Sequence, residues 1–294
     1  MTMTNEKLIS IWFNDITERP FNKSEKTRDT YAKEIKYFLD FIKKDIVDID
    51  KADVKTYMQS INAGISDSSY NTALAGISSL YKILGYDVRT ENIIKNNPTY
   101  GVIRVTVKNK EKVPLTPEEE RALLQNCKND RDYAILLMLL STGVRINELI
   151  NITLEQYNNR DKYNGIKLVV TKRSKIRSIY LNDKVIAAIE KYLKIRKDGA
   201  DTLFTSNSGE IMSRTSISRT FKCIATRSGC FTNDRISQIA PHLMRCTCAT
   251  NMADGGVPVQ IVQKMLGHTN LNTTMRYVKV NNDSLKDVMI NYSI

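Results

Sequence analysis

A short lysine-rich stretch constrains the fold of this chain more than any other feature. Residues 105–113 (VTVKNKEKV) lose the hydrophobic periodicity that runs before them. They lead into a helix-start signal, in which Thr116 can cap the helix, Pro117 takes its first position and acidic residues fill its first turn. We therefore predict a basic linker at 105–113 between a domain at 1–104 and another at 114–294. A chain of 294 residues suits two domains.

The two predicted domains differ in their patterns. In the first, apolar residues recur at helical spacing over residues 27–42 and again over residues 74–84, which predicts a small all-helical domain. In the second, helical patterns flank two short β-prone segments, Lys167–Val170 and Ser178–Leu181, and the basic segment Thr171–Arg177 between them is typical of a hairpin turn. The predicted fold class is mainly α with a small antiparallel β-sheet.

The positive charge is concentrated in the second half of the chain. The formal net charge is +12. Residues 1–100 carry 14 basic and 14 acidic side chains, residues 101–113 carry four and one, and residues 114–294 carry 26 and 17. A basic domain and a basic linker suit a protein that follows nucleic-acid phosphates. RNA has little support as the partner, because we find no RRM-type aromatic motif or Gly-x-x-Gly loop in a suitable context.

The remaining composition favours an intracellular protein without a bound metal. The start, MTMTNEKLIS, lacks the features of a signal peptide, and no apolar run approaches the roughly 20 residues of a membrane span. The five cysteines are odd in number and form no C-x-x-C, so we expect free thiols. Cys246 and Cys248 lack the usual spacing of zinc ligands. We expect a cytoplasmic, nucleoid-associated protein that uses no membrane and no cofactor.

The candidate chemical residues gather near the carboxyl end. The only two histidines, His242 and His268, lie within 27 residues of one another. A helix start before His242 would put His242 and Arg245 on one face. His268 follows Gly267, the expected C-cap of a helix at Val259–Leu266. A chain reversal at this glycine could return His268 to the same place.

Singly, such residues have ordinary structural uses, because most arginines form surface ion pairs and most tyrosines pack against their neighbours. Taken together, the candidate residues suggest a chemical role. Phosphoryl transfer needs cationic donors for the non-bridging oxygens, a nucleophile, and an acid for the leaving oxygen. Two arginines, two histidines, a lysine and a tyrosine can supply these without a metal.

These residues and their neighbours resemble the tyrosine recombinase, or phage integrase, family, in particular its Xer and transposon-integrase members. Ser141–Leu149 (STGVRINEL) resembles the family's first arginine box, with Arg145 at the catalytic position and Glu148 as the acid one turn later. Lys172 matches the lysine of the family's β-hairpin. A second lysine in the same predicted turn leaves this assignment open. The other basic residues of the turn are expected to contact the DNA backbone: Arg173, Lys175 and Arg177.

The resemblance continues in order to the end of the chain. Pro241–Arg245 (PHLMR) resembles the His-x-x-Arg box, Leu266–His268 resembles the Leu-Gly-His box, and Tyr277 lies at the nucleophile's usual distance from it. The amino-terminal domain fits the family's SAM-like core-binding domain more loosely. The family often has a histidine and an aromatic residue where this chain has Cys246 and Cys248, and we expect altered packing there without loss of activity.

The resemblance implies six catalytic residues: Arg145, Lys172, His242, Arg245, His268 and Tyr277. The two arginines would clamp the scissile phosphate of double-stranded DNA, since a guanidinium fork matches phosphate oxygens. Tyr277 would attack the phosphate, with His242 as its base. His268 would hydrogen-bond to the phosphate, and Lys172 would protonate the departing 5′ oxygen.

The resemblance also implies the product and the assembly. A 3′-phosphotyrosyl link and a free 5′-hydroxyl would form, and strand exchange would pass through a Holliday junction without ATP, metal or a small-molecule substrate. A homo-tetramer would hold two DNA sites.

The sequence pattern itself predicts a tail at Val278–Ile294, whose helix begins after Asp283 and Ser284 and carries an apolar stripe. The stripe would pack within its own subunit or, as in the family, against a neighbour.

Two other functions stay open at the level of sequence. The first is a DNA-binding accessory protein that keeps the fold without the chemistry, although all six catalytic residue types are present. The second is a type IB topoisomerase, which shares the chemistry and relaxes supercoils as a monomer. The sequence does not choose between integration, transfer of a conjugative element, inversion and dimer resolution. The lack of an obvious arm-binding domain favours recognition of core sites alone.

Overall fold

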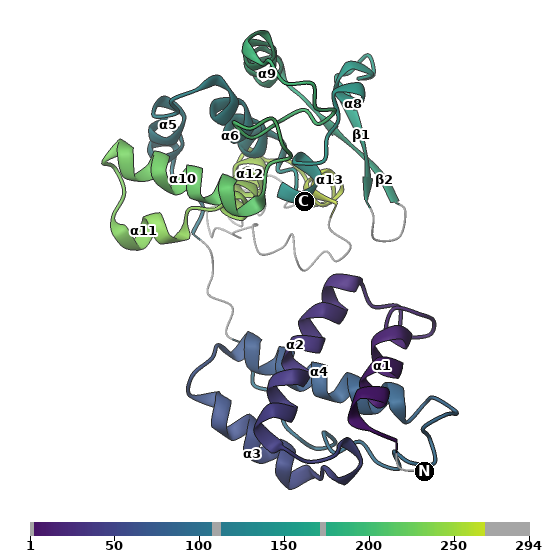
Figure 1. Ribbon diagram of the computed structural model, residues 1–294. Helices are drawn as coiled ribbons and strands as arrows, with labels where there is room; N and C mark the ends of the chain where they lie inside the picture. Colours follow the sequence, from purple (N-terminus) through teal and green to yellow (C-terminus); the bar gives the residue numbers. More distant parts are fainter. Residues whose placement is uncertain (1–2, 108–112, 171–174, 268–294) are drawn as a thin grey trace, which may run out of the picture. The chain divides into compact units, whose positions relative to one another are not determined.

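The computed structural model describes residues 3–107, 113–170 and 175–267, and the chain divides into two units, Met1–Lys110 and Glu111–Ile294 (Figure 1). Each unit has its own hydrophobic core. The division falls inside the stretch 105–113, at which the hydrophobic periodicity of the sequence is lost.

Side-chain caps set the start of each α-helix in the first unit. Thr4, Ser24, Asp50 and Ser66 each accept a hydrogen bond from a backbone N–H of the first turn that has no partner within the helix. The elements are α1 (Asn5–Asp15), α2 (Glu25–Ile42), a 3₁₀ turn at Ile46–Asp48, α3 (Lys51–Asn62) and α4 (Asp67–Leu84). Helix α4 packs against the other three helices. The all-helical prediction for this region is confirmed.

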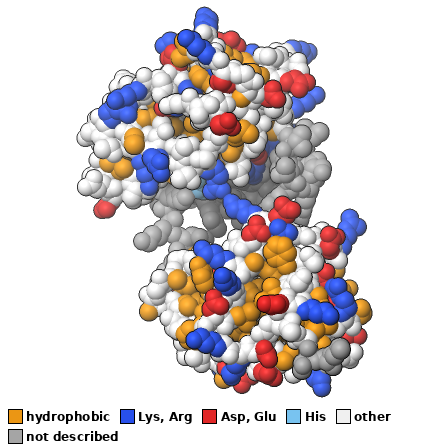
Figure 2. All heavy atoms as spheres, in the orientation of Figure 1, with side chains coloured by type: hydrophobic (Ala, Val, Ile, Leu, Met, Phe, Trp, Pro, Cys, Tyr) orange, Lys and Arg blue, Asp and Glu red, His pale blue; other side chains and the backbone are white. Residues whose placement is uncertain are grey.

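The core of the first unit forms around α4. Trp12 is fully buried, and its indole Nε1 donates to Ser79 Oγ at 3.2 Å. The hydroxyl of buried Tyr81 donates to the carbonyl of Ile46 at 2.9 Å. Figure 2 shows acidic and basic side chains interspersed with hydrophobic ones on the visible face of this unit, in keeping with its balanced charge.

The second unit is built around one helix that is mostly apolar after its charged first turn. Helix α6 (Asp130–Thr142) packs against α9 and α12, and most of its residues are buried (Figure 1). Helix α5 (Pro117–Gln125) starts as predicted, with Thr116 as cap and Glu119 completing a capping box. The other helices are α7 (Ile146–Leu149), α8 (Leu154–Asn158), α9 (Asp183–Ile195), α10 (Arg214–Ser228), α11 (Asn233–Gln238), α12 (Pro241–Asp254) and α13 (Val259–Leu266).

One antiparallel hairpin completes this unit, as the predicted fold class required. Strand β1 (Gly165–Val170) pairs with β2 (Lys175–Tyr180), so that Val170 lies opposite Lys175 and Gly165 opposite Tyr180. The sequence prediction that put Lys175 and Arg177 in the turn is wrong. Both belong to β2, because the hydrogen-bonded ladder continues for all six residues of β1.

Within residues 3–107, 113–170 and 175–267, no helix is long and apolar enough to cross a membrane. All five cysteines lie in these ranges as free thiols.

Candidate active site

Three of the six predicted catalytic residues lie in the described part of the chain. Arg145 is the N-cap of α7, and His242 and Arg245 lie on the first turns of α12. Their environments differ, because His242 is exposed whereas Arg245 is only 5% exposed. The other three predicted residues, Lys172, His268 and Tyr277, lie outside the described residues.

Arg145 and Arg245 meet at the C-terminal end of α13. The helix ends in Gly267, whose φ of 65° is the left-handed conformation that glycine adopts at helix C-caps. The last carbonyl groups of a helix lack partners within the helix and carry its negative dipole end. Such groups attract cationic donors. The next residue in the sequence is His268.

The two predicted phosphate-binding arginines donate to neighbouring carbonyls of this turn. Arg145 Nη2 donates to the Gly267 carbonyl at 2.5 Å, and Arg245 Nη2 donates to the Leu266 carbonyl at 2.6 Å. Arg245 Nη1 also donates to the carbonyl of Gly143, at the end of α6. Two guanidinium groups from distant parts of the sequence therefore lie side by side.

A third arginine, which the sequence reasoning did not assign to the site, completes the set. Arg177 Nη1, from β2, donates to the Met265 carbonyl. Three successive carbonyls at the end of α13 thus each accept a hydrogen bond from a different arginine. The side chain of Arg177 is only 10% exposed, and each of its three nitrogens donates to a protein acceptor. Its contact with the DNA backbone stays a prediction.

Glu148 joins two of these arginines. Its carboxylate accepts from the Arg145 backbone N–H and from Arg145 Nη1, both at 2.9 Å. It also accepts from Arg177 Nε at 3.3 Å and from Arg177 Nη2. Burial alone would raise the pKa of Glu148, but the hydrogen bonds and charge of Arg177, aided by Arg145, outweigh it and lower the pKa. The carboxylate is therefore ionised at neutral pH and offsets one of three positive charges.

Cys248 packs closely against Gly143. Gly143 has φ 58°, and a Cβ there would lie 2.5 Å from Leu266 Cδ2 and 3.3 Å from Cys248 Sγ. Cys246 and Cys248 are both buried, and burial raises the pKa of the Cys248 thiol to about 12. A neutral Cys248 thiol packed against Gly143 of the arginine box is consistent with the packing role expected from the sequence.

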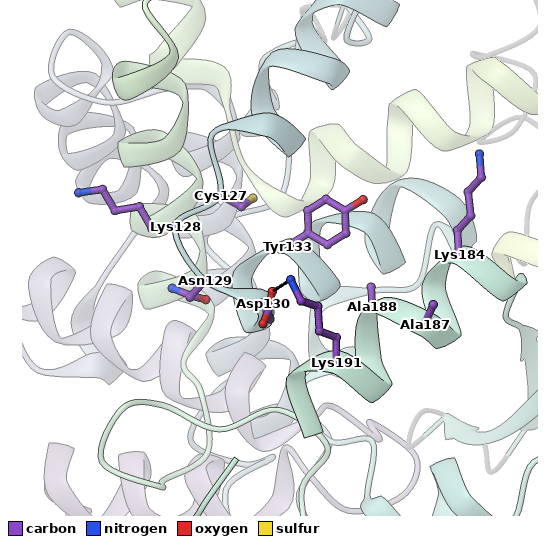
Figure 3. A pocket seen from close by; sticks show the side chains of 9 residues that line it. All are labelled: Cys127, Lys128, Asn129, Asp130, Tyr133, Lys184, Ala187, Ala188 and Lys191. Carbon is purple, nitrogen blue, oxygen red and sulfur yellow. Dashed lines mark ion pairs between the residues drawn. The ribbon is translucent and has the colours of Figure 1, made fainter. Parts of the chain in front are cut away.

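A surface cavity of about 700 Å³ lies elsewhere in this unit, between α6, α9 and the segment before α6 (Figure 3). Three lysines line it, Lys128, Lys184 and Lys191, and the Lys191 ammonium lies 2.8 Å from a carboxylate oxygen of Asp130. Of the predicted catalytic residues that the structure describes, Arg145, His242 and Arg245, none lines it. Across the described ranges, no group of three or more His, Cys, Asp or Glu residues could hold a metal ion.

Comparison with known proteins shows the family of this chain. Residues 114–284 match the phage integrase family, and residues 10–88 match the N-terminal SAM-like domain of phage integrases. The tyrosine recombinase XerC of Pelobacter propionicus is 29% identical over 287 residues, which cover 92% of this chain and 90% of that protein. XerA of Pyrococcus horikoshii is 30% identical over 238 residues, which cover 77% and 74%.

A solved structure shows the same fold. The Tn1549 transposon integrase in complex with transposon right end DNA superposes with a TM-score of 0.73 at 21% identity, over 99% of this chain and 100% of that one. The family match at 114–284 spans more than half of the sequence. The chain therefore belongs to the phage integrase family and is a tyrosine-type site-specific recombinase.

Proposed function

We propose that this recombinase cleaves and rejoins double-stranded DNA through a 3′-phosphotyrosine at Tyr277, with a Holliday junction as the intermediate. One observation carries most of the support. Arg145 and Arg245, from α7 and α12, donate to adjacent carbonyls directly before His268. Two fixed guanidinium groups at one point are what a phosphodiester undergoing substitution requires.

The arginines would stabilise the charge that builds on the non-bridging oxygens. A guanidinium carries five N–H groups, so Arg145 can hold Glu148 and Gly267 and still donate to a phosphate. The Arg145 side chain is 38% exposed, which leaves it accessible to DNA. Its hydrogen bonds to protein acceptors hold it before substrate arrives, so little reorganisation is needed in the reaction.

The proton transfers would fall to the other predicted residues. The phenolic oxygen of Tyr277 attacks phosphorus as its proton passes to His242, and the bond from phosphorus to the 5′ oxygen breaks. Lys172 protonates that oxygen, while His268 donates to the phosphate. The free 5′-hydroxyl then attacks the phosphotyrosine of the partner strand and releases the tyrosine. The ester keeps the bond energy, and therefore no ATP is consumed.

We further propose that a homo-tetramer acts on two DNA sites in the cytoplasm, for a mobile element, a phage, or chromosomal inversion or resolution. The relatives named above support this class of reaction. The target sequence is best obtained by sequencing the DNA that is trapped on Tyr277 in cells, because the covalent link preserves the site of cleavage.

A suicide substrate tests the nucleophile. DNA nicked near the site should give a slowly migrating covalent adduct with the wild-type protein and with Tyr163→Phe, which changes an exposed tyrosine of the same unit. Tyr277→Phe should bind DNA and give no adduct, since it loses one oxygen while affinity depends on many cationic contacts. An adduct with Tyr277→Phe would assign another nucleophile, and none with wild type would favour an accessory protein. Relaxation of supercoils by the isolated protein at low concentration would favour a topoisomerase.

A further inference from the structure

Arg177 occupies an unusual position on the hairpin. Alternate residues of a strand share a face, and opposed residues of an antiparallel pair share it too. Arg177 therefore lies on the same face as Leu168, which is opposite to it, and as Ile179, two residues along β2. Both of these neighbours are buried. An arginine thus stands on the apolar face of the hairpin.

Stability alone does not account for an arginine at this position. Burying a guanidinium removes it from water, and a buried ion pair is seldom more stable than well-packed apolar residues of similar volume. Contact with DNA does not account for it either. Its side-chain nitrogens donate to Glu148 and to the Met265 carbonyl.

The acceptors of Arg177 show what it connects. Glu148 in turn holds both the backbone N–H and the Nη1 group of Arg145. Met265 belongs to the helical turn whose next two carbonyls accept from Arg245 and Arg145. One largely buried side chain therefore joins the hairpin, the carboxylate and the end of α13.

We propose that Arg177 is a positioning residue of the cleavage reaction. It fixes the Glu148 carboxylate and the last turn of α13, and through them it sets the orientation of the Arg145 guanidinium. The proposal rests on the proposed phosphotyrosine chemistry, in which that guanidinium holds the scissile phosphate. Arg177 itself touches neither DNA nor the reacting atoms.

The test compares the rate of cleavage with the affinity for DNA. For Arg177→Gln, adduct formation on a suicide substrate at saturating DNA should be about 10- to 100-fold slower than for the wild type, because a misplaced donor stabilises the transition state poorly. The DNA dissociation constant and its dependence on salt should stay at the wild-type values. A residue that only supports the fold would not separate rate from affinity in folded protein.

Arg196 offers a matched control in the same unit. Its side chain is only 4% exposed, pairs with Asp198 and donates to nearby carbonyls after α9: Ala200, Thr202 and Leu203. Among the described residues, no hydrogen bond or ion pair joins these partners to Arg145 or Arg177. Arg196→Gln removes a comparable buried guanidinium, so it should lower thermal stability while the folded protein keeps its cleavage rate.

Two more variants keep the proposal testable if Arg177→Gln folds poorly. The double variant Arg177→Gln with Glu148→Gln leaves no unpaired buried charge at this pair, and it should fold and bind DNA yet cleave slowly. Arg177→Lys keeps the charge on a single nitrogen, which cannot reproduce the fork that spans Glu148 and Met265. It should also cleave more slowly than the wild type.

The outcomes separate the two proposals. No adduct with the wild type would overturn the phosphotyrosine chemistry and this inference together. A wild-type adduct, with Arg177→Gln or Arg177→Lys equally fast, would overturn only the positioning role. Full cleavage by the double variant would mean that Arg177 merely neutralises Glu148. If Arg177→Gln cleaves at the wild-type rate and its DNA affinity depends less on salt, by about one phosphate contact, Arg177 instead contacts the DNA backbone.

Discussion

Alanine in place of Gly267 gives the sharpest test of how the arginines are held. Gly267 ends α13 at φ 65°, and Gly229 ends α10 at φ 68°, so the two glycines adopt nearly the same left-handed conformation. An alanine at either position costs about 1–2 kcal/mol in backbone strain. Their surroundings differ, because a Cβ at Gly229 meets nothing within 4 Å.

A Cβ at Gly267 would contact both arginines that donate to Glu148, namely Arg145 and Arg177. It would lie 2.9 Å from Arg177 Cδ, 3.3 Å from Arg177 Nε and 3.4 Å from Arg145 Nη1. The Arg177 side chain must therefore move by a few tenths of an ångström, with an overpacking cost of about 1–3 kcal/mol beyond the strain. Displacement of positioned donors should also slow cleavage, by up to about 100-fold.

Urea unfolding followed by circular dichroism measures the stability of each variant, and single-turnover adduct formation measures its cleavage rate. We expect Gly229→Ala to lose stability only, and Gly267→Ala to lose more stability and to cleave slowly as well. If the two alanine variants match in both measurements, the arginines tolerate the displacement, and the reasoning from close contact is refuted.

Four further predictions concern the site and the tail. Arg145→Lys should slow cleavage nearly as much as Arg145→Ala, by about 10²–10³-fold, because an ammonium cannot form a fork; near-native activity would reduce Arg145 to charge balance. The pKa of Glu148 is lowered from its usual 4.5, so the ionised carboxylate stabilises the fold above that pH. The stability gap between wild type and Glu148→Gln should therefore shrink on acidification, whereas a constant gap would contradict the assignment. Cleavage should survive EDTA, and native mass spectrometry should find no zinc near Cys246 and Cys248; a stoichiometric metal needed for cleavage would overturn the mechanism. Deletion of Leu285–Ile294 should leave a folded, DNA-binding monomer that stops at single-duplex species in analytical ultracentrifugation, and normal tetramer assembly would rule out exchange of the tail between subunits.

Local chemistry made much of this fold predictable from the sequence. Thr116, Pro117 and Glu119 mark a helix start by their own hydrogen-bonding capacity, and the structure begins α5 there. Gly267 marks a helix end, and α13 ends there. The start of α7 at Ile146 is also local, because the Arg145 N–H bonds to the Glu148 carboxylate one turn later.

The contacts that the sequence could not predict join residues that lie far apart in the chain. The spacing of His242 and Arg245 predicted a shared face, yet it could not show that Arg245 would be buried against Gly143 and Leu266. The role of Arg177 depends on where the hairpin turn ends. A turn reaching as far as residue 177 leaves Arg177 outside the ladder, whereas the actual register sets it opposite a buried leucine.

The buried indole of the first unit has a practical consequence for studying the second. Trp12 is the only tryptophan in the chain, and it is fully enclosed in the core around α4. Its fluorescence therefore reports the melting of residues 1–110 alone, whereas circular dichroism records the helices of both units. Suppose a substitution at Arg145, Arg177 or Arg245 shifts the unfolding transition seen by circular dichroism but not the transition seen by Trp12 fluorescence. That substitution has destabilised only the second unit. The wild-type chain thus carries an optical label that separates the stabilities of its two halves.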